Sequence, residues 1–228
     1  MSMMSAFAEN YEEQRDLMVS EVQQMVSMTE SFTGRSVLDE KVVAALKAVP
    51  RHEFVTTAFQ ANAYENTALP ISHSQTISQP YIVALMTDLA EVSADSVVLE
   101  VGTGSGYQAA VLAEIVSHVY SIEIVEPLGL QAKASLKKLG YDNVTVKIGD
   151  GYHGWPEHAP FDAIIVTAAA GHIPEKLIEQ LKPGGHLVIP VGEQAMSQSL
   201  KVLSKDIDGK IEEREVLPVA FVPLTGKH

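Results

Sequence analysis

The stretch that decides the fold is EVGTGSGY at residues 100–107, which follows an apolar, β-branched run and precedes a helical pattern. Its three glycines, Gly102, Gly104 and Gly106, alternate with small polar residues. A backbone without side chains lets a ligand approach a helix N-terminus, where unpaired N–H groups are available. The stretch therefore predicts a strand, a ligand-binding turn and a helix in an α/β protein. A tight turn that binds no ligand is the simpler alternative.

Two classes of cofactor-binding protein use a glycine turn of this kind. The dinucleotide fingerprint G-x-G-x-x-G requires its third glycine at position 107, where this chain has Tyr107. The third glycine comes one residue too early, which argues against NAD. Glu100, an acidic residue two positions before the first glycine, instead resembles motif I of the S-adenosylmethionine-dependent methyltransferases.

Strand and helix patterns alternate on both sides of the turn. Buried-strand patterns occupy residues 97–101, 119–124, 144–148, 161–166 and 187–191, and helical patterns occupy 80–91, 107–116, 128–139 and the stretch from 174 to 183–185. This alternation predicts a doubly wound, mainly parallel sheet with helices on both faces. Together with the resemblance to motif I it implies a Rossmann-like methyltransferase fold. Residues 200–203 and 211–216 flank DIDG at 206–209, which predicts a hairpin and therefore an antiparallel C-terminal edge.

An N-terminal helical extension is expected before the sheet. Apolar residues recur at helical spacing within residues 5–31, and Asp39 can cap a second helix that ends before Pro50. Residues 61–79 have no period, and loops of that length are usually functional or disordered. We expect a single domain over 1–228, made of the extension 1–60, a substrate and active-site loop 61–79 and a cofactor-binding sheet 80–228.

The composition predicts a chain with a sizeable core and no affinity for nucleic acid. Apolar residues make up 46% of it, and the net charge of −13 repels a phosphate backbone. It has no cysteine, and its eight histidines are scattered, so we expect neither disulfides nor a metal site. No stretch resembles a signal peptide or reaches the roughly 18 apolar residues of a membrane span, which predicts a cytoplasmic protein.

Two acidic residues lie at or directly after the ends of the next two strands, at the same edge of the predicted sheet. Glu123, followed by Ile124, can accept hydrogen bonds from both hydroxyls of a ribose. Asp150, next to Gly151, can accept one from an exocyclic adenine amine. Each acid alone is also compatible with a solvated strand end or a turn. Three successive strand ends with such groups together predict a nucleoside cofactor.

The segment before the sheet resembles the protein-L-isoaspartate O-methyltransferase family. The resemblance rests on VPRHEFV at 49–55, LPI at 69–71 and QTISQPY at 75–81. It continues through residues 98–108, 149–151, 161–169, 183–185 and 221–224 and covers nearly the whole chain from about Arg15. It implies an S-adenosyl-L-methionine-dependent enzyme that methylates the free α-carboxylate of L-isoaspartyl residues in damaged proteins and peptides, which initiates their repair.

The resemblance also implies roles for individual residues. Ser78 matches the active-site serine of the family. Two positions depart from family patterns, because some animal members have His where Val83 stands and many bacterial members have Arg where Ala220 stands. The cofactor would be bound by Gln75, Thr76, Ile77, Glu100, Gly102, Gly104, Gly106, Glu123, Ile124, Asp150, Gly151 and Thr225.

Methyl transfer to a carboxylate depends on orientation rather than on a strong base, because the attacking oxygen is ionised at neutral pH. Ser78 is therefore interpreted as a hydrogen-bond donor to the acceptor, although it could instead be the N-cap of the helix that begins at Pro80. Two other functions stay open, a methyltransferase for a different carboxylate and a catalytically silent cofactor-binding module. We expect a monomer that binds isoaspartyl proteins and peptides, and neither nucleic acid nor membranes.

Overall fold

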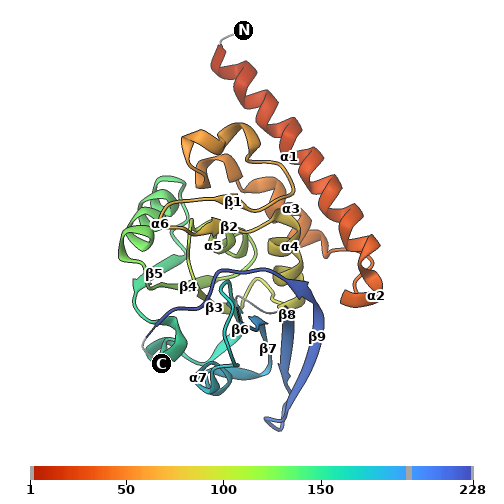
Figure 1. Cartoon of the computed structure of the whole chain (residues 1–228), viewed down its shortest axis with the longest axis vertical. Coiled ribbons are helices and arrows are strands. Elements are labelled where there is room, and N and C mark those ends of the chain that lie inside the picture. Colours follow the sequence, from red (N-terminus) through yellow and green to blue (C-terminus); the bar gives the residue numbers. More distant parts are fainter. Residues whose placement is uncertain (1–2, 194–196, 227–228) are drawn as a thin grey trace.

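A seven-stranded sheet forms the centre of the computed structural model, which describes residues 3–193 and 197–226, with side chains from residue 10 onward (Figure 1). The strand order is β5-β4-β3-β6-β7-β8-β9. The parallel strands are β3 (Val97–Val101), β4 (His118–Glu123), β5 (Val144–Ile148), β6 (Phe161–Val166) and β7 (Leu181–Val191). The antiparallel edge consists of β8 (Gln198–Lys205) and β9 (Ile211–Val219). The predicted fold class is confirmed.

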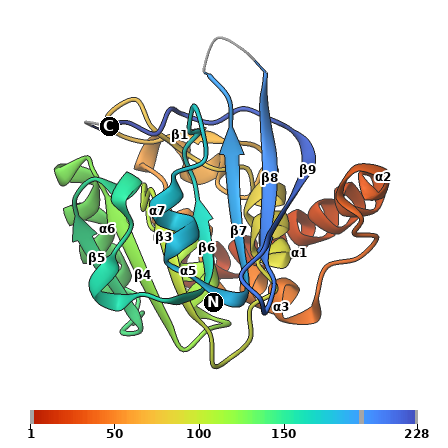
Figure 2. The ribbon, with the colours of Figure 1, turned by 90° about the horizontal axis from the view of Figure 1, so that it is seen from below.

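Helices cover the two faces of the sheet unequally (Figure 2). One face packs against a thick layer that includes α3 (Glu40–Ala48), α4 (Pro80–Leu89), α5 (Tyr107–Ala113) and α6 (Glu126–Lys138). The other is covered by α7 (Glu175–Glu179) and by the short 3₁₀ helices η3 (Gly151–His153) and η4 (Pro156–His158). Because side chains alternate along a strand, Val98 belongs to the first core and Leu99 to the second.

The N-terminal extension lies outside the sheet layer. Helix α1 (Met3–Met28) packs on α3 and α4, and the short α2 (Glu30–Thr33) ends at Gly34, whose φ is 70°. The Asp39 side chain accepts a hydrogen bond from the Lys41 N–H at 3.0 Å, which confirms the predicted cap. None of the described helices is long and apolar enough to cross a membrane.

Residues 61–79 are less irregular than their sequence predicts. They follow the 3₁₀ helix η1 (Arg51–Phe54) and begin within a second one, η2 (Thr57–Asn62). They contain two short strands, β1 (Leu69–Pro70) and β2 (Thr76–Ile77). The strands form an antiparallel pair in which Leu69 lies opposite Ile77. Two-residue strands are too short to produce a period, so the sequence shows only a loop.

The sequence places one boundary between a helix and a strand too late. It predicts a helix from residue 174 to 183–185 and a strand at 187–191. Helix α7 ends at Glu179, and β7 already begins at Leu181, opposite Phe161. The register then shifts, so that Ala163 pairs with His186. Gly185 fits this irregularity because a Cβ there would lie 2.6 Å from the Asp162 carbonyl oxygen. Pro-Gly-Gly therefore forms a bulged part of the strand rather than a helix end.

Candidate functional site

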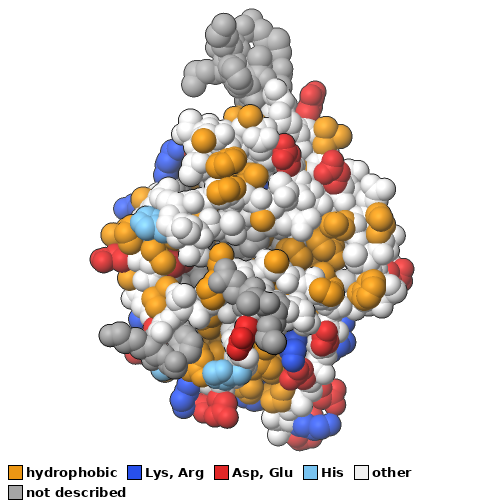
Figure 3. All heavy atoms as spheres, viewed as in Figure 1, with side chains coloured by type: hydrophobic (Ala, Val, Ile, Leu, Met, Phe, Trp, Pro, Cys, Tyr) orange, Lys and Arg blue, Asp and Glu red, His pale blue; other side chains and the backbone are white. Residues whose placement is uncertain are grey.

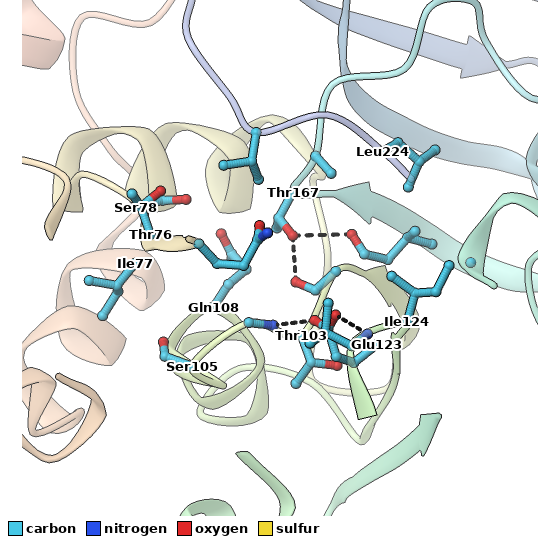
Figure 4. A pocket seen from close by; sticks show the side chains of 18 of the residues that line it. Thr76, Ile77, Ser78, Thr103, Ser105, Gln108, Glu123, Ile124, Thr167 and Leu224 are labelled. Carbon is cyan, nitrogen blue, oxygen red and sulfur yellow. Dashed lines mark hydrogen bonds between the residues drawn. The ribbon is translucent and has the colours of Figure 1, made fainter. Parts of the chain in front are cut away.

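A pocket lies at the carboxyl ends of the parallel strands, next to β2 and the C-terminal segment (Figure 4). It has an empty volume of about 770 Å³ that opens to solvent. Open α/β sheets bind ligands at this edge. The main contributors are residues 75–78, the glycine turn 102–105, residues 122–125 at the end of β4, and residues 167–168 and 222–225.

The glycine turn follows β3 and is held against the end of β6. Gly102, Gly104 and Gly106 have φ values of 98°, 53° and 91°, a region that favours glycine. A Cβ at Gly102 would lie 2.4 Å from the Thr167 hydroxyl oxygen, and that hydroxyl donates to the Val101 carbonyl at 3.1 Å. The turn therefore needs glycine for its conformation and for its contact with Thr167.

Glu123 is buried at the end of β4 and holds the same turn from the other side. Its Oε2 accepts from the Gly104 N–H at 2.8 Å, and its Oε1 accepts from the Val125 N–H at 2.9 Å. Each carboxylate oxygen keeps a further lone pair, so both can still accept from a ribose. Among the described residues that line the pocket, Glu123 is the only charged one.

Glu100 is fully buried and does not line the pocket, although the sequence predicts a cofactor contact there. The Ser121 hydroxyl donates to Oε2 of the Glu100 carboxyl group and lies 2.5 Å from the Thr103 hydroxyl. Burial raises the pKa of Glu100 to about 8, so the carboxyl is protonated at neutral pH. Glu100 can therefore act on a ligand only through Ser121 and Thr103.

Two more of the predicted cofactor residues lie beside the pocket rather than in its lining. Gly106 faces α6, where a Cβ would lie 3.3 Å from the Leu136 side chain. Asp150 caps η3 by accepting from the Tyr152 N–H at 3.0 Å, while the adjacent Gly151 does line the pocket. The other predicted residues, Gln75, Thr76, Ile77, Ile124 and Thr225, all line it.

Ser78 lines the pocket at the end of β2. The N-cap of α4 is Gln79, and within the described part of the chain the Ser78 hydroxyl makes no hydrogen bond. The alternative interpretation of Ser78 as a helix cap is therefore wrong, and its hydroxyl is available to a ligand. Figure 4 shows Ser78 across the cavity from Glu123 and Leu224.

Sequence reasoning missed several lining residues. Thr167 directly follows β6, so the strand-end argument that found Glu123 could also have found it. Gln108, in the first turn of α5, lines the pocket and donates to the Thr87 hydroxyl at 2.8 Å. Of the two departures from family patterns, Val83 lines the pocket, whereas Ala220 is exposed and lies outside its lining.

The pocket fits an adenosyl sulfonium better than a metal ion. Backbone can approach a ligand at Gly102 and Gly151, and a Cβ at Gly151 would lie 2.4 Å from the Val101 side chain. Glu123 supplies acceptors for a ribose. Over the residues that the structure describes, no cluster of three or more His, Cys, Asp or Glu side chains could hold a metal ion.

Comparisons with known proteins agree with this geometry. The family model described as protein-L-isoaspartate(D-aspartate) O-methyltransferase matches residues 22–228. A protein-L-isoaspartate O-methyltransferase 2 from Polaromonas sp. (strain JS666) is 61% identical over 92% of this chain and all of its own length. A protein of the same name from Syntrophobacter fumaroxidans is 59% identical over 94% of this chain and 87% of its own.

Solved structures show the same similarity. A protein-L-isoaspartate O-methyltransferase superposes with a TM-score of 0.81 at 28% identity, over 93% of this chain and 66% of that chain. A Plasmodium falciparum protein, described as a β-aspartate methyltransferase and solved in complex with S-adenosyl-L-homocysteine, gives a TM-score of 0.70 at 27% identity. That match covers 82% of this chain and 91% of the other.

We predict that Glu123→Ala weakens cofactor binding, because two ribose hydroxyls lose a charged acceptor and Gly104 loses the partner of its N–H. The dissociation constant of S-adenosyl-L-homocysteine, measured by calorimetry, should rise about tenfold or more. Glu123→Gln keeps one acceptor oxygen and should show a smaller loss. An unchanged constant in Glu123→Ala would contradict the ribose role.

We also predict a pH dependence of stability that comes from Glu100. In the unfolded chain the carboxyl loses its proton near its ordinary pKa of 4.5, whereas the folded protein keeps it up to about pH 8. The unfolded state then binds fewer protons, so the free energy of unfolding should fall as pH rises through this window. Urea unfolding between pH 5 and pH 8 should show the fall, and Glu100→Gln should lack it. Parallel curves for the two proteins would exclude this origin.

Proposed function

The chain belongs to the protein-L-isoaspartate(D-aspartate) O-methyltransferase family, and we propose how its own residues carry out the transfer. The activity of the family is S-adenosylmethionine-dependent methylation of isoaspartyl residues, the first step of protein repair. The observation that carries the proposal is the unpaired Ser78 hydroxyl beside a pocket formed by the glycine turn and Glu123.

The cofactor is held by backbone and by one carboxylate. When bound, S-adenosyl-L-methionine supplies a methyl group on a positively charged sulfur. In our proposal the turn at Gly102 and Gly104, together with residues 75–77, holds the methionine end. Glu123 and Ile124 hold the ribose, and Thr225 covers the site. Gly151, in the lining, and Asp150, beside it, hold the adenine. Glu100 and Gly106 lie outside the pocket lining and stabilise the conformation of the turn.

Ser78 orients the acceptor. Its hydroxyl would donate a hydrogen bond to one oxygen of the isoaspartyl carboxylate, which would leave the other oxygen free to accept the methyl group that bound S-adenosyl-L-methionine supplies. The acceptor is ionised at neutral pH, so no residue has to remove a proton. The described lining residues include no His, Lys or Arg, which supports a role for Ser78 as a donor and not as an activated nucleophile.

We further propose that the chain works as one domain and as a cytoplasmic monomer, with isoaspartyl proteins and peptides as substrates. Residues 1–60 support the active-site loop 61–79, and residues 80–228 bind the cofactor. A net charge of −13 disfavours contact with nucleic acid or anionic lipid. A methyltransferase for another carboxylate and a silent cofactor-binding module are the alternatives that the following experiment separates.

The substrate test uses two synthetic peptides that differ only in an isoaspartyl or an aspartyl linkage. With labelled S-adenosyl-L-methionine, base-labile label should accumulate on the isoaspartyl peptide alone. Equal label on both peptides would indicate a less selective carboxyl methyltransferase. Cofactor binding without label on either peptide would indicate a silent module.

Ser78→Ala should lower kcat for the isoaspartyl peptide about tenfold or more, since the acceptor loses its orienting donor. The dissociation constant of S-adenosyl-L-homocysteine and the melting temperature should change little, because the hydroxyl caps no helix. Ser78→Thr keeps a hydroxyl and serves as the matched control, with a smaller loss of kcat. A large loss of stability with unchanged kcat would refute the proposed role.

A further inference from the structure

Arg51 is a fully buried arginine in the stretch VPRHEFV, and the mechanism above assigns it no role. It begins η1, ahead of the active-site loop. An ionised side chain is expensive to bury unless its donors are paired. The groups that accept hydrogen bonds from the guanidinium therefore decide how the fold tolerates this buried charge.

The guanidinium of Arg51 binds the active-site loop at three separate points. Its Nε donates to the carbonyl of Ala63 at 2.9 Å. Its Nη2 donates to the carbonyls of Thr67, at 3.3 Å, and Ser78, at 2.8 Å. One rigid fork of donors thus fixes the start, the middle and the end of the segment that carries the serine.

The same guanidinium also contacts the cofactor side of the site. Its central carbon lies 4.6 Å from the ring centroid of Tyr107, the first residue of α5. Tyr107 directly follows Gly106 of the glycine turn and lines the pocket. Phe54, from the same stretch as Arg51, packs edge-on against this ring at 5.8 Å.

The contacts of Arg51 do not resemble an arrangement that serves stability alone. No carboxylate in the described part of the chain forms an ion pair with it, and its Nη1 and the Tyr107 hydroxyl are both buried with no hydrogen-bond partner beyond one another. Burial lowers the pKa of Arg51 to about 10, which leaves it charged at neutral pH. Three backbone carbonyls and an aromatic ring hold the guanidinium, and no carboxylate does. The particular contribution of this arginine is therefore geometric.

We propose that Arg51 is a positioning residue that couples the Ser78 loop to the glycine turn, so that acceptor and cofactor meet in one fixed geometry. The inference rests on the orienting role of Ser78 proposed above. Arg51 touches neither substrate nor cofactor and acts through the carbonyl of Ser78 and the ring of Tyr107. Its loss should change kcat more than cofactor affinity.

The test is a double-mutant cycle with Arg51→Lys, Ser78→Ala and the double variant. Lysine keeps the charge but not the fork. Arg51→Lys should lower kcat for the isoaspartyl peptide about tenfold or more and change the dissociation constant of S-adenosyl-L-homocysteine less than about threefold. In the Ser78→Ala background the same substitution should lower kcat less than about threefold, because the group it positions is gone.

Arg15→Lys is the matched control. Arg15 also donates to two carbonyls, those of Lys47 and Ala48, and lies over a tyrosine ring, that of Tyr64, but it contacts neither Ser78 nor Tyr107. Its kcat should stay within about twofold of the unmodified protein. If Arg51→Lys does not fold, as judged by circular dichroism, the cycle is run with the neutral Arg51→Gln.

Two different results would overturn the inference. If the Arg51 substitution lowers kcat by the same factor with and without Ser78, or leaves kcat within twofold, Arg51 is only a structural residue while the role of Ser78 stands. If Ser78→Ala itself leaves kcat unchanged, the proposed function of the serine fails, and the coupling fails with it.

Discussion

The close approach of backbone to neighbouring strands at the carboxyl edge of the sheet is the constraint on which the site depends. Gly102 lies against Thr167, and Gly151 lies against Val101, in both cases with no room for a Cβ. These contacts draw three strand ends together and place glycine backbone in the lining of the pocket. Glu123 can then accept from the Gly104 N–H of the turn and also line the pocket.

The parallel part of the fold could be predicted closely, since its signals are local. Strands β3, β5 and β6 have the bounds that their apolar runs and flanking turns predict. The sequence could not show where β7 begins, because its first residue is ordered by pairing with Phe161, twenty positions away. The same holds for β1 and β2, whose two-residue pairing is a tertiary contact with no pattern of its own.

The candidate site could be predicted where a residue's role follows from the end of a strand. That argument found the glycines, Glu123 and Gly151, whereas Ser78 was identified by resemblance. It could not reveal residues 222–224, which reach the pocket because Ala169 exchanges backbone hydrogen bonds with Val222 and Leu224. Nor could it show that Glu100 is buried beneath the turn, because motif spacing does not say which way a side chain points.

The near absence of charge in the pocket is itself an argument about the reaction. A carboxylate and a sulfonium neutralise one another as the new bond forms, so the transition state carries less charge than the reactants. A lysine or arginine beside the acceptor would stabilise the ionised carboxylate more than the transition state and would slow the transfer. A hydroxyl such as that of Ser78 also orients the acceptor, but it stabilises the negative charge of the carboxylate less than a cation would. On the face shown in Figure 3, charged side chains are scattered among hydrophobic and uncharged ones. The buried cation Arg51 binds the carbonyl of Ser78 and is not part of the pocket lining. It can therefore fix the position of the serine without stabilising the ionised carboxylate of the substrate.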